Sequence, residues 1–294
     1  MLTEQPRKAS QPESAAAGAL GRHLRQDCKF SISNIVMNNI ESLFSLDGQT
    51  AFISGASSGI GLHVAGLMAR AGATVVLAAR RLDRIEAEVQ RLRAEGHSAS
   101  CVTLDVASPE SITQAWASAE EQVGKPIGIL FNNAGIIYTE RFLDQRLEEV
   151  ERIFDVNLKG AFLLAQVAAR SMVAQRAGSI INVSSTSGLR AGGYMTSYGA
   201  SKAALLSLTQ TMALELAGKG VRVNALCPGN FRTDMHAEFQ ERGLEESLIK
   251  RIPMHAIGEV DQIDGATLLL ASRAGSYMTG STVVVDGGQV LSWM

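Results

Sequence analysis

The sequence predicts an α/β fold, in which a doubly wound parallel sheet of about seven strands carries helices on both faces within a single domain. Three observations support this prediction. Short apolar runs alternate with helical patterns from Gln49 onward, these runs are apolar on both faces, and a glycine-rich turn joins the first run to the first helical pattern. Strands that are buried on both faces are typical of parallel sheets, because the crossover helices cover both sides.

The strands and helices are expected in strict alternation. The third helix has a clear start, with Ser108 as N-cap and Pro109 in the first helical position. Right-handed crossovers between such elements give a Rossmann-like domain. The short apolar runs predict strands at 50–55, 73–80, 98–106, 127–135, 178–185, 221–229 and 281–288. The helical patterns predict helices at 59–72, 81–96, 108–124, 148–175 and 196–220.

The composition excludes several classes of function. The chain has 294 residues, of which 46% are hydrophobic and 19% charged, so it is able to bury a large core. Its 27 basic and 29 acidic residues offer no electrostatic basis for binding nucleic acid. No apolar run reaches the roughly 18 residues of a membrane span. The spacing of Cys28, Cys101 and Cys227 predicts neither a metal site nor a disulfide scaffold, and it suits a reducing, cytoplasmic location.

The first 46 residues differ from the rest of the chain. Their beginning is small, polar and rich in serine and proline, which is typical of a disordered tail. The stretch lacks the apolar centre of a secretory signal, and Glu4 and Glu13 count against an organelle-targeting segment. We therefore expect a disordered N-terminal extension over residues 1–46, with Met37 as an alternative start, and one folded domain over residues 47–294.

A glycine-rich turn follows the first predicted strand and opens the first helix. Glycines here let the backbone approach a pyrophosphate, and the helix N-terminus offers free N–H groups and a partial positive charge. The spacing GxxxGxG differs from the standard dinucleotide fingerprint GxGxxG, and such glycines also occur as ordinary turn residues. If the turn binds a nucleotide, the contacts come from Gly55, Ser57, Ser58, Gly59, Ile60 and Gly61.

Two arginines at the end of the second predicted strand indicate which nucleotide binds. An acidic residue about 20 residues after the turn would bind ribose hydroxyls and favour NAD. Here Ala79 is followed by Arg80 and Arg81, and a guanidinium matches a 2′-phosphate in charge and geometry. The sequence therefore favours NADP(H) as cofactor and leaves NAD(H) open. Solvated charges at the start of a helix are the alternative interpretation of both arginines.

Further motifs follow in a fixed order. The fourth predicted strand ends in the sequence NNAG at residues 132–135, and Tyr198 and Lys202 form a YxxxK motif with Ser185 thirteen residues before the tyrosine. Together with the glycine turn, these motifs resemble the short-chain dehydrogenase/reductase family from residue 46 to 288. The resemblance implies an oxidoreductase with the catalytic tetrad Asn157, Ser185, Tyr198 and Lys202. It implies further cofactor contacts from Asp105, Val106, Asn133, Ala134, Gly135, Pro228, Gly229 and Thr233, and from Tyr198 and Lys202 themselves.

The residue types of the tetrad suit redox chemistry. Tyr198 and Lys202 are four residues apart on a predicted helix and therefore share one face. A nearby ammonium favours the phenolate, so we expect a tyrosine pKa below its ordinary value near 10, which suits proton exchange with a substrate oxygen. Ser185 is placed to hydrogen-bond that oxygen. The resemblance implies that Lys202 binds the nicotinamide ribose and that Asn157 holds a relay water. Taken singly, each of these residues also fits a structural role.

The substrate is expected beyond the carboxyl ends of the strands. Residues 230–258 are the predicted lid, and residues 188–197 form the opposite wall. Arg190, Arg232 and His236 are candidates to meet a carboxylate, or they are solvated loop charges. Similarity to the gluconate 5-dehydrogenase-like branch favours a sugar acid, polyol or small ketone. Similarity to 3-oxoacyl-carrier-protein reductases provides the alternative.

A catalytically inactive nucleotide-binding sensor is the alternative of a different class, and the intact tetrad argues against it. The family resemblance also implies a homo-oligomer, either a tetramer or a dimer. Residues 151–176, 199–218 and 264–288 are rich in the small and apolar residues that such an interface permits. The expected partners are a small-molecule alcohol or ketone and further copies of the chain, with neither nucleic acid nor membrane.

Overall fold

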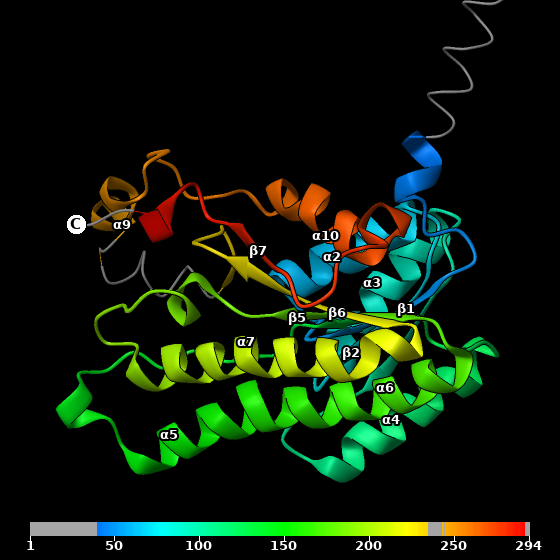
Figure 1. The fold of residues 1–294 in the computed structure, drawn as a ribbon, viewed down its shortest axis with the longest axis horizontal. Coiled ribbons are helices and arrows are strands. Elements are labelled where there is room, and N and C mark those ends of the chain that lie inside the picture. Colours follow the sequence, from blue (N-terminus) through cyan, green and yellow to red (C-terminus); the bar gives the residue numbers. More distant parts are fainter. Residues whose placement is uncertain (1–39, 235–242, 244, 292–294) are drawn as a thin grey trace, which may run out of the picture. The chain divides into compact units, whose positions relative to one another are not determined.

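The computed structural model describes residues 40–234, 243 and 245–291. A seven-stranded parallel sheet forms the centre of the domain that begins at Phe44 (Figure 1). Its strand order, β3-β2-β1-β4-β5-β6-β7, reverses between β1 and β4, which confirms the predicted doubly wound Rossmann-like fold. The strands are β1 (Thr50–Ser54), β2 (Thr74–Ala79), β3 (Ala99–Thr103), β4 (Ile129–Asn132), β5 (Gly178–Val183), β6 (Val221–Pro228) and β7 (Thr282–Val285).

Helices cover both faces of the sheet, as Figure 1 shows. The first face carries α2 (Gly59–Arg70), α3 (Leu82–Ala94) and α10 (Asp264–Ala271). The second face carries α4 (Pro109–Val123), α6 (Ala161–Gln175) and α7 (Thr196–Leu216), and α5 (Leu147–Phe154) packs against α7. The short helix α9 (Glu245–Arg251) lies between β6 and α10 in the chain. None of the helices in the described part combines the length and apolar character that crossing a bilayer requires.

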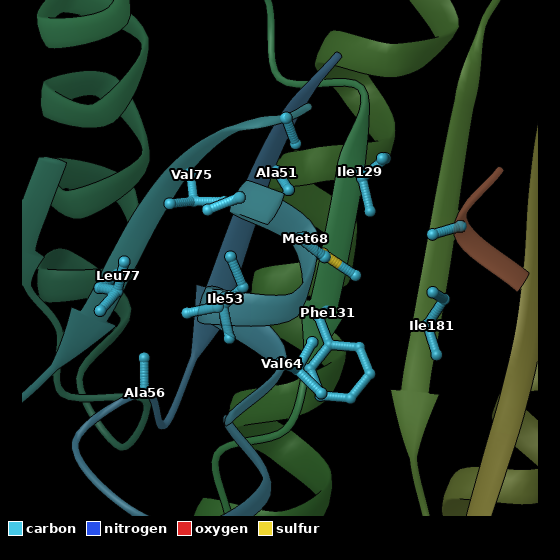
Figure 2. Packing of buried hydrophobic residues seen from close by; sticks show 14 of the residues in the cluster. Ala51, Ile53, Ala56, Val64, Met68, Val75, Leu77, Ile129, Phe131 and Ile181 are labelled. Atoms are coloured by element: carbon cyan, nitrogen blue, oxygen red, sulfur yellow. The ribbon is translucent and has the colours of Figure 1, made fainter. Parts of the chain in front are cut away.

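The two faces of each strand feed two separate cores, because successive side chains point to opposite sides of a sheet. Figure 2 shows Ala51 and Ile53 of β1 beside Val64 and Met68 of α2 in the first core. Phe52, which lies between those two strand residues, instead faces the second core and stacks near Trp116 of α4, with ring centroids 5.2 Å apart. The sheet is therefore a rigid platform whose carboxyl edge positions the loops that follow it.

A chain of buried amides ties the second helical layer to the sheet. Asn132 at the end of β4 donates from Nδ2 to the Ala161 carbonyl (2.9 Å) and to Asn182 Oδ1 of β5 (3.0 Å). Asn182 in turn donates to Thr209 Oγ1 of α7 (2.9 Å). Because unpaired buried amides are costly, these bonds fix where α6 and α7 sit on the sheet.

The region predicted as one helix over 148–175 contains a local change of winding. Between α5 and α6, residues Asp155–Gly160 form a π-helical segment. A Cβ atom at Gly160 would collide with the Val106 carbonyl oxygen, so the segment passes unusually close to the end of β3. Such π-helical turns often occur at functional sites, and this one contains Asn157.

The folded domain includes the last residue of the predicted extension. Leu46 is fully buried, and its N–H donates to the Ala71 carbonyl (2.7 Å). Of the extension predicted over residues 1–46, residues 1–39 lie outside the described residues, so their disorder stays a prediction.

Candidate active site

Two adjoining cavities open at the carboxyl edge of the sheet, where the strand order reverses. The larger, of about 360 Å³, is lined by the glycine turn after β1, the start of α3, the loop after β3 and residues 133–136. The smaller, of about 160 Å³, is lined by Ser185, Tyr198, Lys202 and the segment after β6. The cavities share walls formed by Ile60, Asn133, Gly135 and Thr233, so one extended ligand is able to occupy both.

The glycine turn requires its glycines. Gly55 and Gly59 have φ values of +67° and +55°, in the left-handed region that favours glycine. A Cβ atom at Gly55 would lie 2.9 Å from both Ala134 Cα and Asn133 Nδ2, and one at Gly61 would collide with the Gly55 carbonyl oxygen. Ser58 is the N-cap of α2 but makes no side-chain capping bond. The turn therefore presents backbone, helix amides and a hydroxyl not used in capping to the larger cavity.

Ser54 joins the glycine turn to the loop after β4. Its Oγ accepts from the N–H groups of Asn133 (2.9 Å) and Ala134 (3.1 Å), and Asn133 Nδ2 donates back to the Ser54 carbonyl (3.1 Å). The hydroxyl at this position therefore fixes the two loops as one wall of the larger cavity.

The two arginines lie where the sequence predicts them. Arg80 and Arg81 are exposed and line the larger cavity, together with Asp105 and Val106 of the loop after β3. Arg81 donates from Nη2 to Ser57 Oγ in the glycine turn (3.3 Å). A guanidinium therefore lies beside the phosphate-binding turn, in a position to pair with an anion there.

Tyr198 and Lys202 lie one turn apart near the start of α7 and line the smaller cavity with Ser185. Lys202 Nζ lies 5.9 Å from the centroid of the Tyr198 ring and donates to the Val183 carbonyl (2.9 Å). Ser184 Oγ donates to the Lys202 carbonyl (2.8 Å), which ties α7 to the end of β5. The YxxxK spacing thus brings both groups to one cavity.

Asn157 lies behind this cavity and is fully buried. Its Oδ1 accepts from the Ile136 N–H (2.8 Å), and its Nδ2 donates to the Ile136 carbonyl (2.9 Å) and to Ser201 Oγ (3.2 Å). A Cβ atom at Gly135 would lie 3.3 Å from Asn157 Oδ1 and 3.4 Å from Lys202 Nζ. Asn157 therefore fixes the backbone beside Lys202, and the relay water stays a prediction.

Burial changes the pKa values of both α7 groups. Burial raises the pKa of Tyr198 above its ordinary 10, and a hydrogen bond with Ser185 only partly opposes this effect. Burial also lowers the pKa of Lys202 from 10.5 to about 8. The expected lowering of the tyrosine pKa is therefore wrong for the free protein, because desolvation of the phenolate is the largest influence on that pKa and outweighs the hydrogen bond with Ser185.

The predicted lid is described in part. Phe231 and Leu248 of α9 line the smaller cavity, while His236 lies outside the described residues. Arg232 donates to Glu259 (2.8 Å) and to Glu245 of α9 (3.1 Å). These bonds join the start of the predicted lid to α9 and to the residue that follows the lid. On the opposite wall, Arg190 donates to the Val290 carbonyl (3.0 Å), and Met195 lines the cavity.

The structure adds cavity residues that sequence reasoning did not find. Arg152 and Val156 line the larger cavity from α5 and the π-helical segment, and Asn230 and Gln289 line the smaller one. Three of them lie within five residues of a predicted site residue and Gln289 does not, but nothing in the local sequence shows which way any of these side chains points. Two predicted residues, Gly61 and Asn157, support the cavity walls without being part of them.

Known proteins with similar sequences or structures give a consistent picture. The family model described as enoyl-(acyl carrier protein) reductase matches residues 55–289. A galactitol 2-dehydrogenase (L-tagatose-forming) of Cereibacter sphaeroides is 39% identical over 84% of this chain and 97% of its own. A 3-oxoacyl-[acyl-carrier-protein] reductase of Thermotoga maritima is 35% identical over 84% of this chain and 99% of its own. A gluconate 5-dehydrogenase from Burkholderia cenocepacia, crystallised in complex with NADP and tartrate, has a TM-score of 0.83 and 35% identity over 86% of this chain and 99% of its own.

The buried Lys202 predicts a specific pH dependence of stability. Its pKa is lower in the folded state, so between pH 8 and 10.5 the unfolded chain binds more protons and folding gains stability as the pH rises. Relative to Lys202→Met, the wild-type free energy of unfolding should therefore increase by about 2 to 3 kcal/mol between pH 7 and pH 10. Urea denaturation at both pH values measures this change.

The exposed Lys219, for which Lys219→Met is the matched variant, provides the control. Its substitution should give the same difference from wild type at both pH values. A Lys202→Met difference that is equally independent of pH would contradict the lowered pKa.

Proposed function

Because the chain belongs to the short-chain dehydrogenase/reductase family, we propose that it interconverts a secondary alcohol and a ketone with NADP(H). The favoured substrate is a sugar acid, a polyol or a small ketone. The observation that supports this proposal most is the continuity of the two cavities, because Ser185, Tyr198 and Lys202 line the one that adjoins the cavity of the glycine turn.

The residues of the larger cavity fit a dinucleotide. Gly55 leaves no room for a Cβ atom beside Ala134 and Asn133, so the turn keeps bare backbone at the cavity, and Arg80 and Arg81 supply the charge for a 2′-phosphate. Gly135, Thr233 and the segment Pro228–Gly229 would hold the nicotinamide end, since they line the cavity that contains the tetrad groups. When bound, the cofactor supplies or accepts the hydride.

We propose that Tyr198 moves the proton. Burial keeps its hydroxyl protonated in the free protein, which suits donation to a ketone oxygen during reduction. Ser185 holds the same oxygen by a hydrogen bond. Lys202, held by the Val183 carbonyl, provides the positive charge that stabilises the phenolate after the proton has left. In the oxidative direction Tyr198 acts as the base, and the same ammonium favours its deprotonation.

The lid, the assembly and the location complete the proposal. The proposed lid is the segment 230–258, of which residues 235–242 and 244 lie outside the described part; Phe231 and Leu248 support this proposal, because both line the smaller cavity. The chain forms a homo-tetramer through α6, α7 and β7, where the apolar side chains of Phe162, Leu214 and Val284 are 44%, 83% and 37% exposed.

The proposed location is the cytoplasm, in line with the unpaired Cys101 and Cys227. A tagged chain should therefore appear in the cytoplasmic fraction of the cell.

Light scattering coupled to size-exclusion chromatography measures the assembly directly. We expect a mass about four times that of the 31.3 kDa chain, which falls when Leu214→Glu places a charge on the exposed α7 face. A wild-type protein that elutes as a monomer at micromolar concentration would contradict the proposed tetramer.

Turnover of a ketone panel by the purified chain tests the function. With NADPH and 5-ketogluconate, ketohexoses, acetoacetyl thioesters and 2,3-butanedione, absorbance at the NADPH band should fall. Tyr198→Phe should lower kcat by at least about 100-fold while it retains NADPH binding, because it removes the transferred proton and preserves the ring.

An enzyme that prefers acetoacetyl thioesters is a 3-oxoacyl-carrier-protein reductase instead, as is the Thermotoga maritima relative. Binding of NADPH without turnover of any ketone would identify the inactive sensor.

The arginines at the larger cavity predict cofactor preference. The double variant Arg80→Ala with Arg81→Ala should raise KM for NADPH by about 10- to 100-fold and leave KM for NADH nearly unchanged, because NADH lacks the 2′-phosphate. Steady-state kinetics with both cofactors measure this. Arg84→Ala, an exposed arginine of α3 outside the cavity lining, is the control and should change neither value. A wild-type preference for NADH would refute the assignment.

A further inference from the structure

Two neutral amides meet in the wall of the smaller cavity. Asn230 follows Pro228–Gly229 at the end of β6, and Gln289 follows the glycines after β7. Both line the cavity that contains Ser185 and Tyr198, and Asn230 Nδ2 donates to Gln289 Oε1 (3.1 Å). Residues about 60 apart in the sequence thus form one polar wall beside the groups that handle the substrate oxygen.

The pair is held rigidly from behind. Asp286 accepts from the Gly288 and Val290 N–H groups with its two carboxylate oxygens (2.8 Å each), and the Gln289 N–H donates to the Asp286 carbonyl (3.2 Å). A Cβ atom at Gly229 would lie 3.0 Å from Gln289 Oε1, so the glutamine side chain lies directly against the segment after β6. The amides are therefore fixed before any substrate arrives.

The mutual hydrogen bond leaves both a donor and an acceptor unused. Within the described part of the chain, this bond is the one hydrogen bond that these two side chains make with protein atoms. It joins the NH2 group of one residue to the carbonyl oxygen of the other. The NH2 group of the second residue and the carbonyl oxygen of the first therefore remain free to bind a ligand, whichever way the amides are turned. A hydroxyl group both donates and accepts, and it satisfies this pair. A carboxylate only accepts and would meet the remaining carbonyl oxygen unfavourably.

The rest of the cavity offers little to an anion. Among the described residues that line it, Lys202 carries the one charge, and its ammonium already donates to the Val183 carbonyl. The two arginines that the sequence suggested for a carboxylate are engaged elsewhere, Arg190 with the Val290 carbonyl and Arg232 with two glutamates. Among the described lining residues, a carboxylate would therefore find the Lys202 ammonium as its one charged partner, and leaving water for so few charged partners is costly.

We infer that Asn230 and Gln289 form a hydroxyl-binding pair that selects an uncharged polyol, or the hydroxyketone formed from it, over the corresponding sugar acid. This inference rests on the proposed function and narrows its substrate class. Ser185 and Tyr198 hold the oxygen that changes oxidation state, and the amide pair holds a second hydroxyl of the same molecule. Because an alcohol with one hydroxyl lacks this second contact, the pair also favours polyhydroxylated substrates over simple ones.

Matched substrates test the inference on the full-length protein. The kcat/KM values with NADP are measured for sorbitol, mannitol and galactitol, and for gluconate, mannonate and galactonate, which differ from the hexitols in one terminal group. The preferred hexitol should exceed its aldonate at least 10-fold. Gln289→Leu should lower kcat/KM for that hexitol about 10-fold or more, mainly through KM, and at least several-fold more than it lowers kcat/KM for reduction of 2,3-butanedione, which has no hydroxyl.

Additional variants keep the test decisive. Asn230→Leu removes the same pair from the other side and should reproduce the effect, so it replaces Gln289→Leu if that protein does not fold. Gln289→Lys should shift the preference towards the aldonate, because it places a cation at the same point. Gln90→Leu, on exposed α3 surface outside both cavities, is the matched control and should alter neither substrate.

The outcomes separate this inference from the function on which it rests. A wild-type preference for the aldonates overturns the inference, as does an equal effect of Gln289→Leu on the hexitol and on 2,3-butanedione. In both cases NADP(H)-dependent turnover still supports the proposed function. Absence of turnover with every alcohol and ketone, including 2,3-butanedione, overturns the proposed function itself.

Discussion

The placement of a buried lysine beside a buried tyrosine is the constraint on which the site depends. Removing the Lys202 ammonium from water is unfavourable, and its pKa falls to about 8 as a result. The Val183 carbonyl accepts a hydrogen bond from this ammonium, and Ser184 ties the helix that carries Lys202 to the end of β5. Asn157 fixes the loop that faces the lysine. The end of β5, the first turns of α7 and the π-helical segment are therefore organised around one amine, and the tyrosine one turn away shares its surroundings.

The same edge of the sheet joins nucleotide binding to substrate binding. The glycine turn and the loop after β4 are linked through the Ser54 hydroxyl, and Gly135 belongs to both cavities. At one end the exposed arginines offer charge, which suits a phosphate. At the other end the described lining residues are apolar side chains, hydroxyls and neutral amides, with Lys202 as the one charged group. This difference in electrostatic character along one continuous cleft is the basis on which we propose separate places for an anionic cofactor and an uncharged substrate.

Much of this arrangement could be predicted from the sequence because the signals are local. Doubly buried strands alternate with amphipathic helices, and a four-residue spacing on a helix places Tyr198 and Lys202 on one face wherever that helix lies. The raised pKa of Tyr198 could not be predicted, since it depends on burial by the whole fold. The π-helical segment that contains Asn157 lies in close contact with Val106, about 50 residues away, and the pairing of Asn230 with Gln289 depends on β6 lying beside β7. These features arise from packing between distant segments, which residue patterns along the chain do not reveal.

The distances around the substrate oxygen in a crystal structure with NADP(H) and a bound ketone or unreactive alcohol test the central claim most directly. The account requires Tyr198 Oη and Ser185 Oγ within hydrogen-bonding distance of that one oxygen, with Lys202 Nζ on the same side of the cleft. If the substrate oxygen instead contacts other groups, or the Tyr198 hydroxyl points away from the nicotinamide, the proposed proton transfer is contradicted.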